Sequence, residues 1–99
     1  ERLVADLGDN KVMILRNHGL LTTGMSVADA WVQMYFLEKV CSAQLKLLSA
    51  AAASGQSIRY PSKEVCEHTA EQYENSGCGE REWPSLIRQL DDVTTDYKY

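Results

Sequence analysis

The chain has 99 residues, of which 44% are hydrophobic and 24% charged, with a net charge of −4 at pH 7. This composition is typical of one small globular domain. The acidic balance does not favour binding to nucleic acid or to an anionic membrane. No run of about 18 apolar residues occurs, so no transmembrane helix is predicted. We therefore expect neither a nucleic-acid nor a membrane partner.

The three cysteines, Cys41, Cys66 and Cys78, are odd in number and form no C-x-x-C pair. This pattern argues against a disulfide framework or a zinc ribbon and is typical of a reducing compartment, so we expect a cytoplasmic protein. Cys66 and His68 are two residues apart, which places them on different sides of a helix and does not favour a metal pair.

The N-terminal third predicts a helix end followed by two short strands. Helical spacing of apolar residues runs up to Gly8, a plausible C-terminal cap. A strand is predicted over residues 11–16, and its apolar run, residues 12–15, does not alternate with polar residues, which predicts burial on both faces of a sheet. Residues 20–23 form a second strand, and the short connection favours an antiparallel pair.

The strongest element is a long helix from Val27 to about Ala53, in which neither Pro nor Gly occurs. Ser26 is a good N-cap, and Asp29 three residues later makes a variant of the capping box. At 1.5 Å per residue the helix would span about 40 Å, more than a globule of this size needs. We therefore expect part of it to pack on another part of the protein or on another subunit. An apolar stripe at helical spacing should face a core; it contains Ala30, Met34, Leu37, Cys41, Leu45 and Leu48.

The C-terminal part predicts two further helices. A loop over residues 56–60 leads to Ser62, which can cap a polar surface helix over residues 63–75. A glycine-rich breaker follows, and Pro84 suits the first turn of a third helix. The predicted apolar face of that helix contains Leu86, Ile87, Leu90 and Val93. The charged segment over residues 91–99 is expected to fray.

His18 is the candidate functional residue, because it stands where the first predicted strand ends. A sheet can hold an imidazole there in one orientation, as a metal ligand or a general base requires. From spacing alone, a structural histidine bonded to the backbone is the more common alternative. Asn17 and Gly19 tolerate turn backbone and let the chain pass close to a metal, although an ordinary tight turn explains both equally well.

The sequence Val12-Met-Ile-Leu-Arg-Asn-His-Gly-Leu-Leu21, with Gly24-x-Ser26-x-x-x-Ala30 and Leu37-Glu38 after it, resembles the second half of the class II aldolase/adducin family. The resemblance is strongest over residues 1–55, and residues 56–99 read as a C-terminal helical extension. Family members carry a His-x-His pair and a catalytic glutamate in an earlier segment, and neither occurs here. We therefore expect residues 1–99 to be the C-terminal part of a single domain in a longer protein.

This resemblance implies a three-layer α/β/α fold, represented here by the edge of a mostly antiparallel central sheet, one long helix and two C-terminal helices. It also implies that His18 completes a three-histidine site for one zinc, or a similar divalent ion, per subunit. Such a metal would act as a Lewis acid on a small carbonyl or sugar-phosphate-like substrate and stabilise an enediolate in aldol cleavage. Asn17 and Gly19 would support the site. The resemblance assigns no catalytic or substrate-binding residue in this chain, and it implies a homo-oligomer, commonly a tetramer.

Three alternatives stay open at this stage. Epimerases and dehydratases of the family use the same metal chemistry, so the metal is better specified than the reaction. Adducin-like members keep the fold as non-catalytic binding and assembly proteins, in which His18 would be an inherited structural residue. A paralogue with metal but an unassigned substrate is equally compatible with the sequence. Glu38 is better explained as an exposed helix carboxylate than as a catalytic group.

Overall fold

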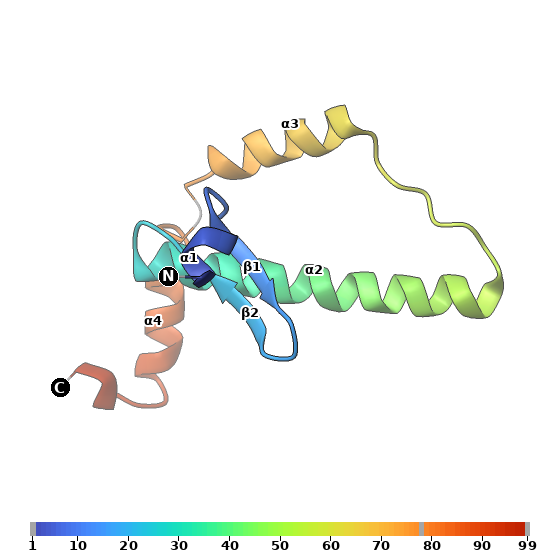
Figure 1. Cartoon of the computed structure of the whole chain (residues 1–99). Helices are drawn as coiled ribbons and strands as arrows, with labels where there is room; N and C mark the ends of the chain where they lie inside the picture. Colours follow the sequence, from blue (N-terminus) through green and yellow to red (C-terminus); the bar gives the residue numbers. More distant parts are fainter. Residues whose placement is uncertain (1, 78, 99) are drawn as a thin grey trace.

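The computed structural model describes residues 2–77 and 79–98. The elements are α1 (Arg2–Leu7), β1 (Val12–Leu15), β2 (Gly19–Thr22), α2 (Val27–Ser54), α3 (Lys63–Glu74), α4 (Trp83–Asp91) and a 3-10 turn, η1 (Asp96–Lys98). Figure 1 shows the β-hairpin beside the N-terminal half of α2, with α3 and α4 on opposite sides of that helix. The expected helices and strands are thus present. None of the described helices is long and apolar enough to cross a membrane.

The hairpin is antiparallel, as predicted, with Ile14 opposite Leu20 and Leu15 opposite Gly19. Its open end is extended by a hydrogen bond of 2.8 Å from the Thr23 amide to the carbonyl of Lys11. Both strands pack against α2. The hydroxyl of Thr22 donates a hydrogen bond of 2.8 Å to the carbonyl of Ala30, which joins β2 to the first turn of α2.

The long helix begins and ends as its sequence predicts. The Asp29 amide donates to the Ser26 hydroxyl at 3.1 Å, while the Asp29 carboxylate accepts from the Met25 amide at 3.0 Å. The first bond is the expected N-cap, and the second reaches the amide one residue before the N-cap, which makes this a variant of the capping box. At the other end Gly55 has a φ of 69° and its amide bonds to the Ala51 carbonyl at 2.9 Å. The 28 residues of α2 span about 42 Å.

Few side chains are fully buried. Within the described residues, Val32 is the only buried hydrophobic side chain, at 1% exposure. The prediction that the first strand is buried on both faces is wrong for this structure, since Ile14 is 68% exposed. The reason is that the described sheet has two strands and packs against one helix. The apolar stripe of α2 is likewise covered beside the hairpin and exposed beyond it, at Leu45 and Leu48.

A run of aromatic rings connects α2 with the two C-terminal helices. Trp31 stacks on Tyr35 and meets Trp83 of α4 edge-on, with ring centroids 5.7 and 6.5 Å apart. Phe36 meets Tyr73 of α3 edge-on at 5.7 Å. Such pairs stabilise beyond the area they bury. The rest of α3 is exposed, which confirms its prediction as a surface helix.

The C-terminal segment, which was predicted to fray, contains a polar cluster between residues 91 and 98. The Asp91 carboxylate accepts from the Tyr97 hydroxyl at 2.6 Å and pairs with the Lys98 ammonium at 2.6 Å. The contact with Lys98, and to a smaller extent that with Tyr97, holds the pKa of Asp91 below its usual range. Val93 is also not part of an apolar face, because it follows α4 and is 83% exposed.

Candidate metal-ligand site at the hairpin turn

The turn between β1 and β2 carries His18. The His18 amide donates to the Leu15 carbonyl at 3.1 Å, which closes a four-residue turn. Asn17, the second central residue of this turn, has a φ of 60°, a conformation that asparagine tolerates better than most residues. Gly19 follows with a φ of 132°. The expectation that both residues provide special backbone geometry is therefore confirmed; their support of a metal site stays a prediction.

The ring of His18 is anchored to its own turn. Its Nδ1 lies 3.1 Å from the carbonyl oxygen of Arg16. A carbonyl can only accept a hydrogen bond, so Nδ1 must carry the proton. In the neutral ring Nε2 then holds the lone pair. A histidine metal ligand is commonly oriented in this way, by a bond from its second nitrogen to a carbonyl or a carboxylate.

His18 borders a shallow hollow between the hairpin and α1. The wall on the α1 side contains Arg2 and Asp6, which form an ion pair at 3.7 Å, and Arg16 lies on the β1 side. Met13, Ile14 and Leu3 give the hollow apolar lining. The sequence pattern singled out His18 as the candidate but did not identify Arg2 or Asp6. Their four-residue spacing on a helix was the available signal.

The side chains of the described residues could supply one metal ligand, the Nε2 atom of His18. The His18 side chain is exposed and its Nε2 is available, as a zinc ligand requires. Among residues 2–77 and 79–98, no group of three His, Cys, Asp or Glu side chains is placed to hold a metal. Cys66 and His68 lie exposed on α3, Cys41 and Cys66 are free thiols, and Cys78 lies outside the described residues.

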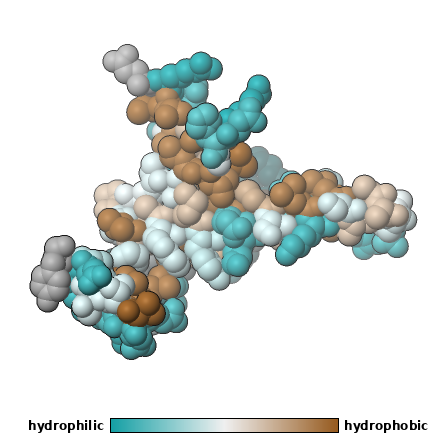
Figure 2. All heavy atoms as spheres, turned by 90° about the horizontal axis from the view of Figure 1, so that it is seen from below, coloured by the Kyte–Doolittle hydropathy of each residue, from teal (hydrophilic) through white to brown (hydrophobic). Residues whose placement is uncertain are grey.

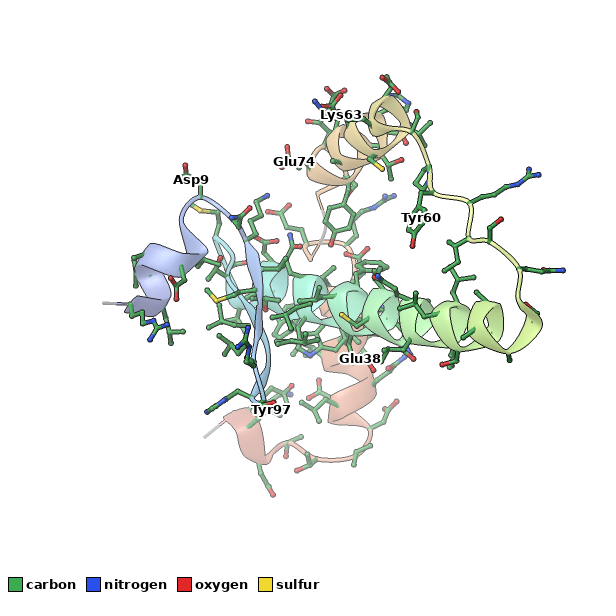
Figure 3. All side chains as sticks on the ribbon, turned by 45° about the vertical axis from the view of Figure 1, so that its right-hand side comes forward. Asp9, Glu38, Tyr60, Lys63, Glu74 and Tyr97 are labelled. Carbon is green, nitrogen blue, oxygen red and sulfur yellow. The ribbon has the colours of Figure 1, made fainter. Side chains whose placement is uncertain are left out.

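Glu38 is not part of this site. It extends from the middle of α2, where its side chain is exposed (Figure 3). It does not border the hollow beside His18. The structure therefore agrees with its interpretation as a helix carboxylate.

An antiparallel hairpin packs on a long helix and carries one histidine in its turn, which is an α/β arrangement. Comparison with known proteins gives the family. Residues 1–45 match the family described as "Class II Aldolase and Adducin N-terminal domain". A Caulobacter vibrioides protein named for aldolase class 2 is 35% identical over 98% of this chain and 37% of its own length. The alpha-adducin of Rattus norvegicus is 33% identical over 91% of this chain and 14% of its own length.

A crystal structure of an aldolase II superfamily protein from Pseudomonas syringae has the same fold. The TM-score is 0.80 at 47% sequence identity, over 99% of this chain and 38% of that one. The chain belongs to the class II aldolase/adducin family, and the predicted α/β fold class is confirmed. It spans less than two fifths of the length of the Caulobacter and Pseudomonas relatives.

Proposed function

We propose that this chain supplies His18 as one ligand of a zinc, or similar divalent ion, in a class II aldolase-type enzyme, one metal per subunit. The observation that carries the proposal is the hydrogen bond between Nδ1 of His18 and the Arg16 carbonyl. It orients the ring and leaves Nε2 as a donor at an exposed position. Membership of a family that includes aldolases adds support.

The proposed reaction is aldol cleavage of a small carbonyl or sugar-phosphate-like substrate. A zinc held by neutral imidazoles keeps its charge and open positions, and so supplies a Lewis acid for a carbonyl oxygen. The residues of this chain would contribute positioning. Arg16 and Arg2, at the hollow beside His18, suit an anionic group such as a phosphate, because guanidinium binds phosphate in a planar fork. Asp6, paired with Arg2, would orient that guanidinium.

We further propose that the protein works as a homo-oligomer, as a tetramer, in the cytoplasm. Large apolar side chains remain exposed on α2, among them Val40 at 59% and Leu47 at 52%. Figure 2 shows hydrophobic surface on the part of the molecule that extends to the right, where the C-terminal half of α2 lies in Figure 1. A patch of this kind marks a contact surface. The free thiols of Cys41 and Cys66 suit a reducing compartment.

A non-catalytic binding function is the second candidate, and the observation that favours it is the similarity to alpha-adducin. Under this alternative, the bond between His18 and Arg16 would serve only to close the turn. The two candidates differ in whether the protein retains a metal.

The deciding experiment is elemental analysis of the purified full-length protein to which this chain belongs, as wild type, His18→Ala and His68→Ala. His68 is the matched control, because it is the other histidine of the chain and is also exposed, on α3. We expect about one zinc per subunit in wild type and His68→Ala, and loss of the metal in His18→Ala, with circular dichroism unchanged. Metal-free wild type, or full metal content in His18→Ala, would overturn the proposal in favour of the binding function.

A further inference from the structure

We propose that Asn17 is a positioning residue that selects the tautomer of His18. The proposal concerns backbone geometry, not a contact of the Asn17 side chain. Asn17 stands between the carbonyl of Arg16 and the ring of His18, and its φ of 60° determines how these two groups meet. The inference rests on the proposed function, because the tautomer matters only if Nε2 of His18 is used as a donor.

The first step of the argument is the closure of the turn. The Leu15 carbonyl accepts from the His18 amide at 3.1 Å, and Asn17 has a φ of 60° within this turn. A left-handed residue at this position sets the orientation of the Arg16–Asn17 peptide, which is reversed in a turn whose two central residues both have negative φ. With the turn closed in this way, the Arg16 carbonyl lies 3.1 Å from Nδ1 of His18. A different φ at residue 17 rotates the peptide planes on both sides and separates these atoms.

The second step is the restriction on residue type. An L-residue with a β-carbon meets steric resistance at this φ, and Asn and Gly are the residues that adopt it most readily. Alanine at position 17 should therefore shift the local equilibrium away from this turn conformation, on the order of tenfold. Glycine should retain the turn. The pair Asn17→Ala and Asn17→Gly thus separates backbone geometry from the amide side chain, since both variants remove that amide.

The third step links the turn to the ring. While the Arg16 carbonyl accepts from Nδ1, the neutral ring is held as the Nδ1–H tautomer with its lone pair on Nε2. If the turn leaves this conformation, the proton is free to move to Nε2. Molecules with the proton on Nε2 have no lone pair there to offer to a metal. Loss of such an orienting bond at metal sites lowers metal affinity by about 10–100-fold.

The test is a long-range 1H–15N NMR spectrum of the His18 and His68 imidazoles in the metal-free full-length protein, with the His18 signals assigned from His18→Gln. The spectrum is recorded in mildly alkaline buffer, and the one-bond pattern of each ring is used to select the signals of the neutral form. Pyrrole-like and pyridine-like nitrogens have different 15N shifts, so the tautomer is read directly. His68 provides an internal control and is assigned with His68→Gln. We expect a pyrrole-like Nδ1 at His18 in wild type and Asn17→Gly, a mixed tautomer in Asn17→Ala, and an unchanged His68 in all three.

A proton on Nε2 of His18 in wild type would overturn the inference, as would an Asn17→Ala spectrum identical to wild type. If Asn17→Ala does not fold, Asn17→Ser replaces it, because serine also resists this φ. Zinc titration supplies the second readout, with an affinity about tenfold lower in Asn17→Ala than in Asn17→Gly. Because the tautomer is measured without metal, a protein that binds no zinc refutes the proposed function but leaves this test decisive.

Discussion

Substitution of Gly79 by alanine tests how the connection between α3 and α4 is packed on α2. Gly79 is buried and has a φ of 98°. A β-carbon placed there would lie 2.8 Å from the carbonyl carbon of Ala28 and 2.8 Å from the amide nitrogen of Asp29. Both are backbone atoms in the first turn of α2. The clash therefore cannot be relieved by rotating a flexible side chain.

Gly77 is the matched control. It also has a positive φ, 65°, but a β-carbon there meets no atom within 4 Å. Gly77→Ala should cost only the conformational penalty of a left-handed residue, about 1–2 kcal/mol. Gly79→Ala adds overpacking of about 1–3 kcal/mol to a similar backbone penalty. We therefore expect Gly79→Ala to lower the free energy of unfolding by at least about 1 kcal/mol more than Gly77→Ala.

Urea unfolding followed by tryptophan fluorescence measures this difference. Trp31 on α2 and Trp83 on α4 have ring centroids 6.5 Å apart, so their emission reports on the same packed region. Equal unfolding free energies for Gly77→Ala and Gly79→Ala would refute the reasoning, because the two variants differ mainly in the contact with residues 28 and 29.

Two further predictions concern a helix cap and the C-terminal cluster. Ser26→Ala removes the acceptor for the Asp29 amide and should lower the free energy of unfolding by about 1 kcal/mol. Ser26→Asp keeps a side-chain acceptor and should retain most of the wild-type stability. Equal stability of Ser26→Ala and wild type in urea would contradict the assigned cap. The hydrogen bond from Lys98 is the larger cause that lowers the pKa of Asp91, and the hydrogen bond from Tyr97 is the smaller one. The ionised carboxylate therefore stabilises the folded form above its ordinary pKa of 3.8. This stability is lost as the pH falls through the lower pKa of Asp91 in the folded form. An acid titration followed by the Tyr97 ring signals in NMR should show release of η1 in that range, and Asp91→Asn should show it already at neutral pH; wild-type ring signals in Asp91→Asn would argue against the cluster.

Local sequence signals predicted the secondary structure because each rests on neighbouring residues. Ser26 with Asp29, and Ser62, act within one helical turn, and the structure shows each in its expected cap. The antiparallel hairpin followed from the short connection around Asn17. These choices depend on backbone geometry and on near contacts, which the order of residues specifies.

Features that depend on distant partners were missed. Nothing near Asp91 in the sequence indicated that Tyr97 and Lys98 would turn back to it, so the segment was predicted to fray. The close approach of Gly79 to residues 28 and 29 joins positions about fifty apart, and its glycine was interpreted only as a helix breaker. The hollow beside His18 likewise needed the fold to bring Arg2 and Asp6 to β1. For the site, sequence predicted the residue, and the structure added the hydrogen bond that orients it.

The extended shape of α2 has a consequence for how this protein is stabilised. The described structure exposes 8488 Å², whereas a compact monomer of 11.1 kDa would expose about 5,700 Å². The difference, about 2,800 Å² on this chain alone, is comparable to one partner's share of a large obligate interface, for which the total over both partners reaches about 5,000 Å². Any surface that covers α2 binds the folded form and not the unfolded chain, so it raises the unfolding free energy by mass action. Folding and association of this helix are therefore thermodynamically linked, and its stability should rise with the concentration of whatever it contacts.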